Sequence, residues 1–173
     1  MFEVLVFVYE NYWRGDVCPQ WNQLERKLNA VGFEAQEIQE ALAWLNGLSQ
    51  ATRDTRHVHG AKPAPDDQDS SVQQADRQAI ANSGTSMRVF SVNEQNRLGP
   101  ECLGFIRFLE SAAVLAPHMR EIVVDRAMAC GSDPLPLDDF KIIVLMVYWS
   151  FGEEPDALVL DELCDDAQGR IAH

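Results

Sequence analysis

Two apolar stripes at helical spacing, joined by a glycine, constrain the fold of this chain more than any other feature. The first stripe runs from Trp21 to Val31 and the second from Ile38 to Leu48. Gly32 suits the left-handed residue that ends a helix, and Phe33 can pack back on the last turn. The pattern predicts a hairpin of the helix-turn-helix kind, which serves DNA binding or partner binding in small proteins. We expect its inward positions to be Trp21, Leu24, Leu28, Val31, Ile38, Ala41, Leu42, Leu45 and Leu48.

The charge of this hairpin opposes DNA binding. Its second helix and the residues before it carry Glu34, Glu37 and Glu40 and no Lys or Arg, whereas a helix that reads the major groove presents basic and amide side chains. The whole chain has a formal net charge of −13, which repels phosphate backbones and anionic membrane surfaces and suits a basic partner. We therefore predict no direct nucleic-acid binding and no membrane association.

Residues 49–86 differ sharply in composition from the sequence on either side. Val58, Val72 and Ile80 are nearly the only large aliphatic residues there. Such a segment buries too little apolar surface to offset its ordering entropy, so we predict a disordered linker. The linker divides the chain into an N-terminal helical unit (1–48), the linker itself (49–86), a C-terminal helical unit (87–152) and an acidic tail (153–173).

Both units are expected to be mainly helical, with one short strand. Residues 2–13 favour a helix, although their alternating valines also suit a strand. Residues 87–90 predict a short strand, and Ser91 with Glu94 predicts a capping box for the helix that follows. Pro100 and Pro117 suit the first turns of two further helices, the second closed by Gly131.

The run from residue 140 to 149 is apolar nearly all round, which indicates a helix buried at the centre of a domain. A buried strand is the alternative, because the run is rich in β-branched residues. Asp138 or its neighbour Asp139 is the expected cap and dipole partner. We expect this helix to organise the C-terminal unit, and the sequence leaves open whether the N-terminal unit packs on it.

No residue set in the chain predicts catalysis, a cofactor or a metal. The nucleotide-binding glycine patterns and the Gly-x-Ser-x-Gly nucleophile turn are absent. The four cysteines, Cys18, Cys102, Cys130 and Cys164, are widely spaced, which favours free thiols. His57 and His59 fall in the predicted linker without a further ligand nearby, which favours surface histidines over a metal site.

The chain also lacks the features of exported and membrane proteins. Its apolar beginning has Glu3 where a signal peptide carries positive charge. The apolar run from residue 140 to 151 is too short to span a bilayer, which takes about 20 residues. We therefore expect a cytoplasmic protein.

Charged residues at helical spacing provide the candidate partner surface. Arg107, Arg120 and Arg126 stand among Glu110, Glu121 and Asp125, a spacing that produces salt-bridged helix faces by default and a charged interface as the alternative. Trp44 flanks the apolar stripe, either as a partly exposed anchor for a partner or as a core residue. The candidate partner surface comprises Glu37, Glu40, Trp44, Arg107, Arg120 and Arg126.

Several segments, in their order and spacing, resemble the bacterial Smg family. They include Met1-Phe2, Val4-Leu5, Gly32-Phe33, Ile38, Ala41-Leu42, Trp44-Leu45, residues 86–90, Cys102, Gly104-Phe105, residues 108–110, Val114-Leu115, Arg120-Glu121, Arg126, residues 137–139 and residues 144–147. The resemblance implies a bacterial, cytoplasmic, mostly helical protein. It brings no established activity, cofactor or catalytic residue. The family's genes often lie near a DNA-processing gene of the Smf type.

Three hypotheses of function follow. The first is a non-enzymatic adaptor for protein–protein interaction, which rests on the acidic surface, the hairpin and the missing catalytic motifs. The second is an accessory factor in nucleic-acid processing that associates with DNA, RNA or a DNA-processing protein. The third is an enzyme whose site carries none of the known motifs, and it requires a concave pocket with convergent polar groups.

Overall fold

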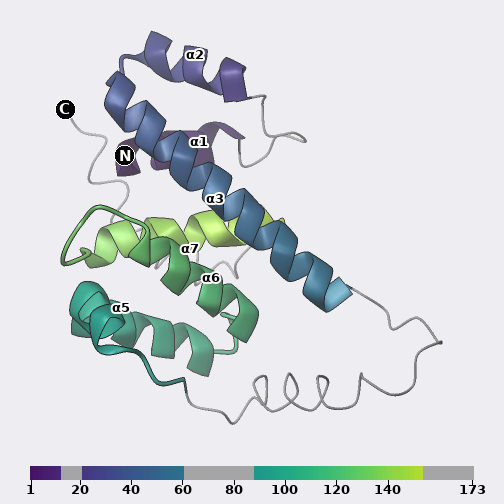
Figure 1. Cartoon of the computed structure of the whole chain (residues 1–173), viewed down its shortest axis with the longest axis vertical. Helices are drawn as coiled ribbons and strands as arrows, with labels where there is room; N and C mark the ends of the chain where they lie inside the picture. Colours follow the sequence, from purple (N-terminus) through teal and green to yellow (C-terminus); the bar gives the residue numbers. More distant parts are fainter. Residues whose placement is uncertain (13–20, 61–87, 154–173) are drawn as a thin grey trace.

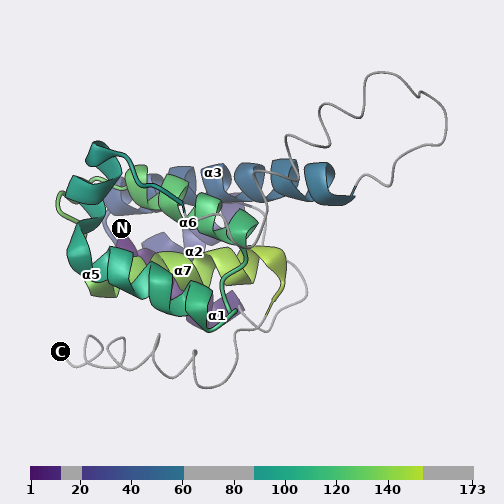
Figure 2. The ribbon, with the colours of Figure 1, turned by 90° about the horizontal axis from the view of Figure 1, so that it is seen from below.

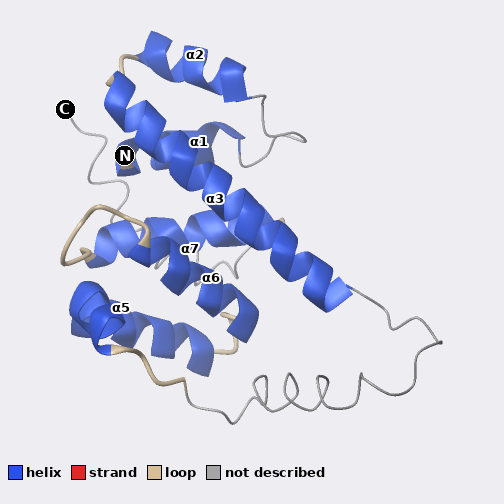
Figure 3. Ribbon diagram, in the orientation of Figure 1, coloured by secondary structure: helices blue, strands red, loops and turns tan. Residues whose placement is uncertain are grey.

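The computed structural model describes residues 1–12, 21–60 and 88–153, and the regular secondary structure of these residues is helical (Figure 3). The helices are α1 (Phe2–Tyr12), α2 (Trp21–Val31), α3 (Ala35–Gly60), α5 (Val92–Ser111), α6 (Pro117–Met128) and α7 (Leu137–Phe151). The prediction of a mainly α fold is confirmed, and the first element is a helix. None of the described helices is long and apolar enough to cross a membrane.

The strand predicted at residues 87–90 is wrong for residues 88–90, which are its described part. These residues form no regular element and lead directly into α5. A strand needs a neighbouring strand to pair its backbone groups, and the described residues contain none. The side chains fix the segment instead, because Phe90 is buried and Arg88 forms ion pairs with Glu94 and Glu121.

Helix α7 lies at the centre of the fold, as its apolar sequence predicts. Every residue from Phe140 to Tyr148 is buried, and the helix contacts α1, α3, α5 and α6. The alternative of a buried strand is therefore excluded. The expected aspartate cap is wrong: the N-cap residue is Pro136, without a side-chain cap bond, and Asp138 and Asp139 lie in the first turn, where carboxylates favour the helix dipole.

Helices α2 and α3 lie on either side of the predicted glycine turn and contact each other. Gly32 has φ of +107°, and the Phe33 N–H donates to the Leu28 carbonyl at 3.3 Å, which closes α2 as expected. Most of the predicted inward residues are buried, and Leu42 is half-buried. Val31 lies at the very end of α2 and is 56% exposed, so its inward prediction is wrong, and the side chain of Trp21 lies outside what the structure describes.

Helix α3 continues to Gly60, so the prediction that a linker begins at residue 49 is wrong for residues 49–60. Thr52 explains part of the error. Its side chain is buried, bonds the Leu48 carbonyl at 2.9 Å and contacts the Ser150 hydroxyl of α7 at 2.9 Å. Thr52 thus links α3 to α7 in a segment whose polar composition predicted no packing against other helices. Residues 61–86 of the predicted linker, and all of the predicted tail except Glu153, lie outside the described residues.

The capping box predicted at the start of α5 is confirmed. The Ser91 hydroxyl accepts from the Glu94 N–H, and the Glu94 carboxylate accepts from the Ser91 N–H. Gly99, at φ +66°, then kinks the helix just before Pro100, where a second helix was expected. Helix α6 begins at Pro117 as predicted but ends at Met128, before Gly131.

The helices on both sides of residues 61–87 share one hydrophobic core. Helix α3 packs on α6 and α7, and α1 packs on α7. Figure 1 shows α2 and the turn into α3 at one end of the long axis and α5 at the other. Figure 2 shows the last turns of α3 extending past the other helices. The N-terminal helices α1 and α3 therefore pack on α7, which the sequence had left open.

Candidate functional site

The structure distributes the six predicted partner-surface residues over several contacts. Glu37 and Glu40 lie near the start of α3, Arg107 on α5, and Arg120 and Arg126 on α6. Glu40 and Arg107 are exposed. The side chains of Arg120 and Arg126 are only 12% and 16% exposed, because each forms an ion pair with neighbouring carboxylates.

Trp44 is a core residue, so its interpretation as a partly exposed anchor is wrong. Its side chain is 4% exposed, and its indole N–H donates to the backbone carbonyl of Arg126 at 3.0 Å. The Cys130 thiol donates to the same carbonyl at 3.3 Å. The Arg126 side chain lies against α3 at Gly47, where an added Cβ would stand 2.0 Å from its Nη1 atom. Trp44 and Arg126 thus hold α3 against α6.

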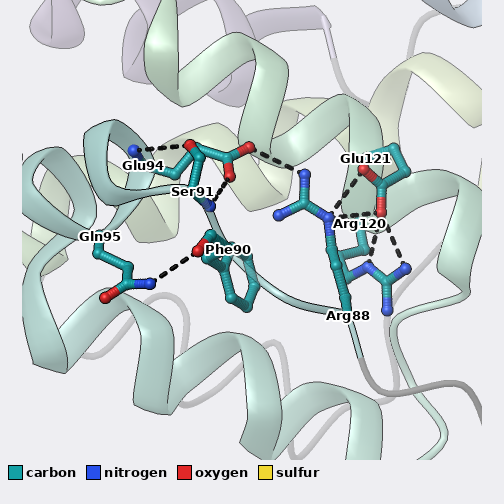
Figure 4. A network of polar contacts seen from close by, with 7 residues as sticks. All are labelled: Arg88, Phe90, Ser91, Glu94, Gln95, Arg120 and Glu121. Carbon is teal, nitrogen blue, oxygen red and sulfur yellow. Dashed lines mark hydrogen bonds and ion pairs between the residues drawn. The ribbon is translucent and has the colours of Figure 1, made fainter.

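Arg88, Arg120 and three glutamates form a network at the junction of α5 and α6, and Figure 4 shows all of them except Glu110. Arg88 donates from Nε to Glu121 at 2.8 Å and from Nη2 to Glu94 at 2.9 Å. Arg120 binds Glu121 at 2.8 Å and also binds Glu110. Two guanidinium groups face three carboxylates, so the network carries no surplus positive charge for an anion. Its contacts fix the segment before α5 to α6.

Electrostatic shifts agree with this structural role. Burial acts to lower the pKa of the Arg88 guanidinium, but its hydrogen bonds to Glu94 and Glu121 outweigh this and raise the pKa. The hydrogen bond from Arg88 lowers the pKa of Glu94 below its ordinary value, against the opposing effect of burial. Both groups are therefore held in their charged forms. Gln95 adds a hydrogen bond to the Phe90 carbonyl at 2.7 Å (Figure 4).

A shallow cavity of about 440 Å³ lies at the turn between α2 and α3, and we call it the acidic depression. Its lining residues are Glu3, Val31, Gly32, Phe33, Glu34 and Glu37. Gly32 leaves open space at the turn, since nothing would lie within 4 Å of an added Cβ. The Glu37 carboxylate accepts a hydrogen bond from the Met1 ammonium group at 3.1 Å.

The acidic depression combines three carboxylates with apolar surface. Glu3 and Glu34 are exposed, Phe33 is half-buried and Val31 is 56% exposed. The predicted partner surface included Glu37 but not Glu3, Glu34 or Val31. Glu3 comes from another helix, and Val31 was expected to point inward. The signal available in the sequence was the run of glutamates around the Gly32-Phe33 turn.

The described cysteines are poor nucleophiles. Cys102 and Cys130 are free and buried. Burial raises the pKa of the Cys102 thiol to about 11 and that of the Cys130 thiol to about 11. A thiol is reactive as its thiolate, so at neutral pH both remain protonated and inert. Cys18 and Cys164 lie outside the described residues.

The described residues contain no group of three or more His, Cys, Asp or Glu side chains that could hold a metal ion. His57 and His59 belong to the last turns of α3, and their side chains lie outside what the structure describes.

Comparisons with known proteins identify relatives over the full length of the chain. A family profile described as "Protein of unknown function (DUF494)" matches residues 1–173. A protein from Leptothrix cholodnii named "Protein Smg homolog" is 52% identical over 173 residues, which is all of both chains. Proteins of the same name from Methylibium petroleiphilum and Herminiimonas arsenicoxydans are 49% and 43% identical, again over all of both chains. No solved structure matches the chain.

Proposed function

We propose that this chain, which belongs to the DUF494 family of Smg homologues, is a non-enzymatic adaptor that binds a basic segment of another protein. The observation that carries the proposal is the acidic depression at the turn between α2 and α3. We place this function in the cytoplasm.

The lining of the depression defines the chemistry of the partner. Glu3, Glu34 and Glu37 come from two segments and face one cavity beside the exposed Val31 side chain. A lysine or arginine can satisfy the carboxylates while its aliphatic stem covers the valine. The partner is therefore a basic segment with apolar atoms next to its charges.

Two further features support a cationic partner. The Met1 ammonium group already binds Glu37, so a carboxylate of the depression is placed to bind an ammonium ion. The net charge of −13 attracts a basic protein over several ångströms and speeds its encounter. The same charges repel nucleic-acid phosphates from this surface.

Capture of partners by charge-reversed proteins tests the proposal. The test variant carries Glu3→Lys and Glu34→Lys, and the matched control carries Glu10→Lys and Glu25→Lys, which are exposed on α1 and α2 outside the depression. Both variants change the net charge equally. Tagged proteins are crosslinked in the native bacterium, and each sample is split into nuclease-treated and untreated halves.

We expect the wild type and the control to recover the same protein from both halves. The test variant should recover at least about tenfold less of it, because the loss of one charge-assisted hydrogen bond weakens binding by about that factor. Equal recovery by both variants would exclude the depression as the binding site. Recovery that disappears after nuclease treatment would exclude the adaptor and favour a nucleic-acid accessory role.

A further inference from the structure

The outer face of α5 presents an aromatic side chain that no other described helix covers. Phe108 is 52% exposed, and the neighbouring Arg107 is exposed as well. Gly104, one turn earlier, leaves open space around the helix. Arg107 and Phe108 together form a basic, aromatic projection, which we call the α5 knob.

Aromatic contacts with the core hold the Phe108 side chain of the α5 knob in place. The Phe108 ring stacks on Phe105 with ring centres 6.2 Å apart, and Phe105 meets the buried Phe140 of α7 edge-on at 6.4 Å. A side chain fixed in this way loses little conformational entropy when it binds. An exposed but pre-ordered aromatic residue beside an arginine has the composition of an interface anchor.

The acidic depression has the complementary properties. It places three glutamates around Val31, whereas the α5 knob places an arginine beside Phe108. Val31 and Phe108 are two of the four large apolar side chains that are exposed among the described residues. A cavity of about 440 Å³ is large enough for a phenyl ring. The depression and α5 lie at opposite ends of the long axis (Figure 1), so one copy of the chain cannot join them.

We propose that the α5 knob of one copy of this chain docks in the acidic depression of a second copy. The contact joins two different surfaces, so it is heterologous, and it extends head to tail unless the rotation closes a ring. Its apolar part is Phe108 on Val31, and its charged part is Arg107 among the glutamates. Since the contact involves few residues and two copies repel through their net charge, the association is weak and measurable towards about 1 mM protein.

Because the second copy and the proposed partner use the same acidic depression, self-association would regulate partner binding. This regulatory role rests on the function proposed above. A partner and a second copy compete for the same glutamates. A depression that holds a knob is closed to the partner, whereas the free depression at the end of an open assembly is not. A rise in partner concentration therefore releases single copies.

Light scattering of the purified chain, with two complementary variants, tests the contact. The knob variant carries Arg107→Glu and Phe108→Ser, and the depression variant carries Glu3→Lys and Glu34→Lys. All four substituted residues are exposed, so we expect both variants to fold. Circular dichroism checks their helix content. The Glu10→Lys and Glu25→Lys protein again serves as the charge-matched control.

We expect the average mass of the wild type and of the control to rise with concentration and that of each variant alone to stay at the monomer value. An equal mixture of the two variants retains one intact knob and one intact depression, so it should form a dimer and nothing larger. Wild type that stays monomeric, or a mixture that fails to dimerise, would overturn the proposal. This test uses no partner, so the adaptor proposal can fail while self-association succeeds, and the reverse.

Discussion

Trp44 has two plausible roles from its position in the sequence, and a single hydrogen bond decides between them. It flanks an apolar stripe, where a tryptophan can serve a partner or the core. The structure turns it towards α6, where its indole N–H meets the Arg126 carbonyl at 3.0 Å. Helical periodicity identifies the face on which a residue lies, but it does not identify the helix 82 positions away that covers it. Contacts of this range lie beyond what periodicity can predict.

Gly47 offers a test of the contact between α3 and α6. Replacing a helical glycine by alanine stabilises a helix by about 1 kcal/mol, which we expect for Gly104→Ala, since its site is open. Gly47→Ala should gain less, because the new Cβ displaces the Arg126 guanidinium. In an Arg126→Ala background, Gly47→Ala should recover the full gain. Urea denaturation of the wild type, the three single variants and the double variant measures these differences, and an equal gain from Gly47→Ala with and without Arg126 would contradict the contact.

The buried thiols predict a loss of stability at alkaline pH. Their folded pKa of about 11 lies above the ordinary value of 9.0, so the folded state binds the protons of Cys102 and Cys130 more tightly than the unfolded state does. This stabilisation is complete below pH 9 and is lost as the pH rises towards 11. It amounts to at most about 3 kcal/mol for each thiol.

The free energy of unfolding should therefore fall between pH 9 and 10, and a Cys102→Ala/Cys130→Ala variant should show a smaller fall. The comparison stops at pH 10 because burial also raises the pKa of Tyr148, from 10.0 to about 12. Above pH 10, ionisation of Tyr148 would add its own loss of stability to that of the thiols. If the free energy of unfolding falls equally steeply with pH in both proteins, burial does not raise the pKa values of the two thiols.

At the scale of elements, local rules predicted helix ends better than helix lengths. The Gly32 turn, the Ser91–Glu94 capping box and the start at Pro117 are set by neighbouring residues and were all predictable. The extension of α3 past Leu48 was not, because the buried Thr52 contacts Ser150 on α7, a residue 98 positions away. The acidic depression was partly predictable, since the glutamates near Gly32 are visible in the sequence, whereas Glu3 joins them only after α1 packs.

The capping box gives a prediction for α5. Ser91→Ala removes the side-chain acceptor of the Glu94 N–H and should lower the free energy of unfolding by about 1 kcal/mol. Ser91→Gly should cost only a few tenths of that amount. Ser111→Ala, at the other end of the helix, is the control and should change stability by less than about 0.5 kcal/mol. Thermal or urea unfolding measures all three, and a loss in the control as large as that of Ser91→Ala would refute the role of the cap.

At the scale of the whole molecule, the helices on both sides of residues 61–87 depend on α7. Because α1, α3, α5 and α6 all contact this helix, the described residues share one core. Its apolar sequence made the central position of α7 predictable. Which helices surround it depends on shape complementarity between distant segments, and composition carries no information about that.

Ile143→Ala tests this shared core. Ile143 is 0% exposed in the middle of α7, so its truncation should cost about 2–5 kcal/mol. Unfolding followed by circular dichroism and by tryptophan fluorescence should remain one coincident transition. Val89→Ala, at a side chain that is 86% exposed, should change stability by less than about 0.5 kcal/mol. Two separate transitions in the wild type would mean that the helices form independent units.

Photo-crosslinking from Val31 tests directly whether the acidic depression binds a partner. A photoreactive amino acid replaces Val31 in one protein and the equally apolar, exposed Val89 in another, and both are irradiated in the native bacterium. From position 31 we expect a crosslinked protein different from this chain, beside any crosslink to a second copy, and from position 89 no product of that mass. No crosslink from position 31, or the same products from both positions, would contradict it.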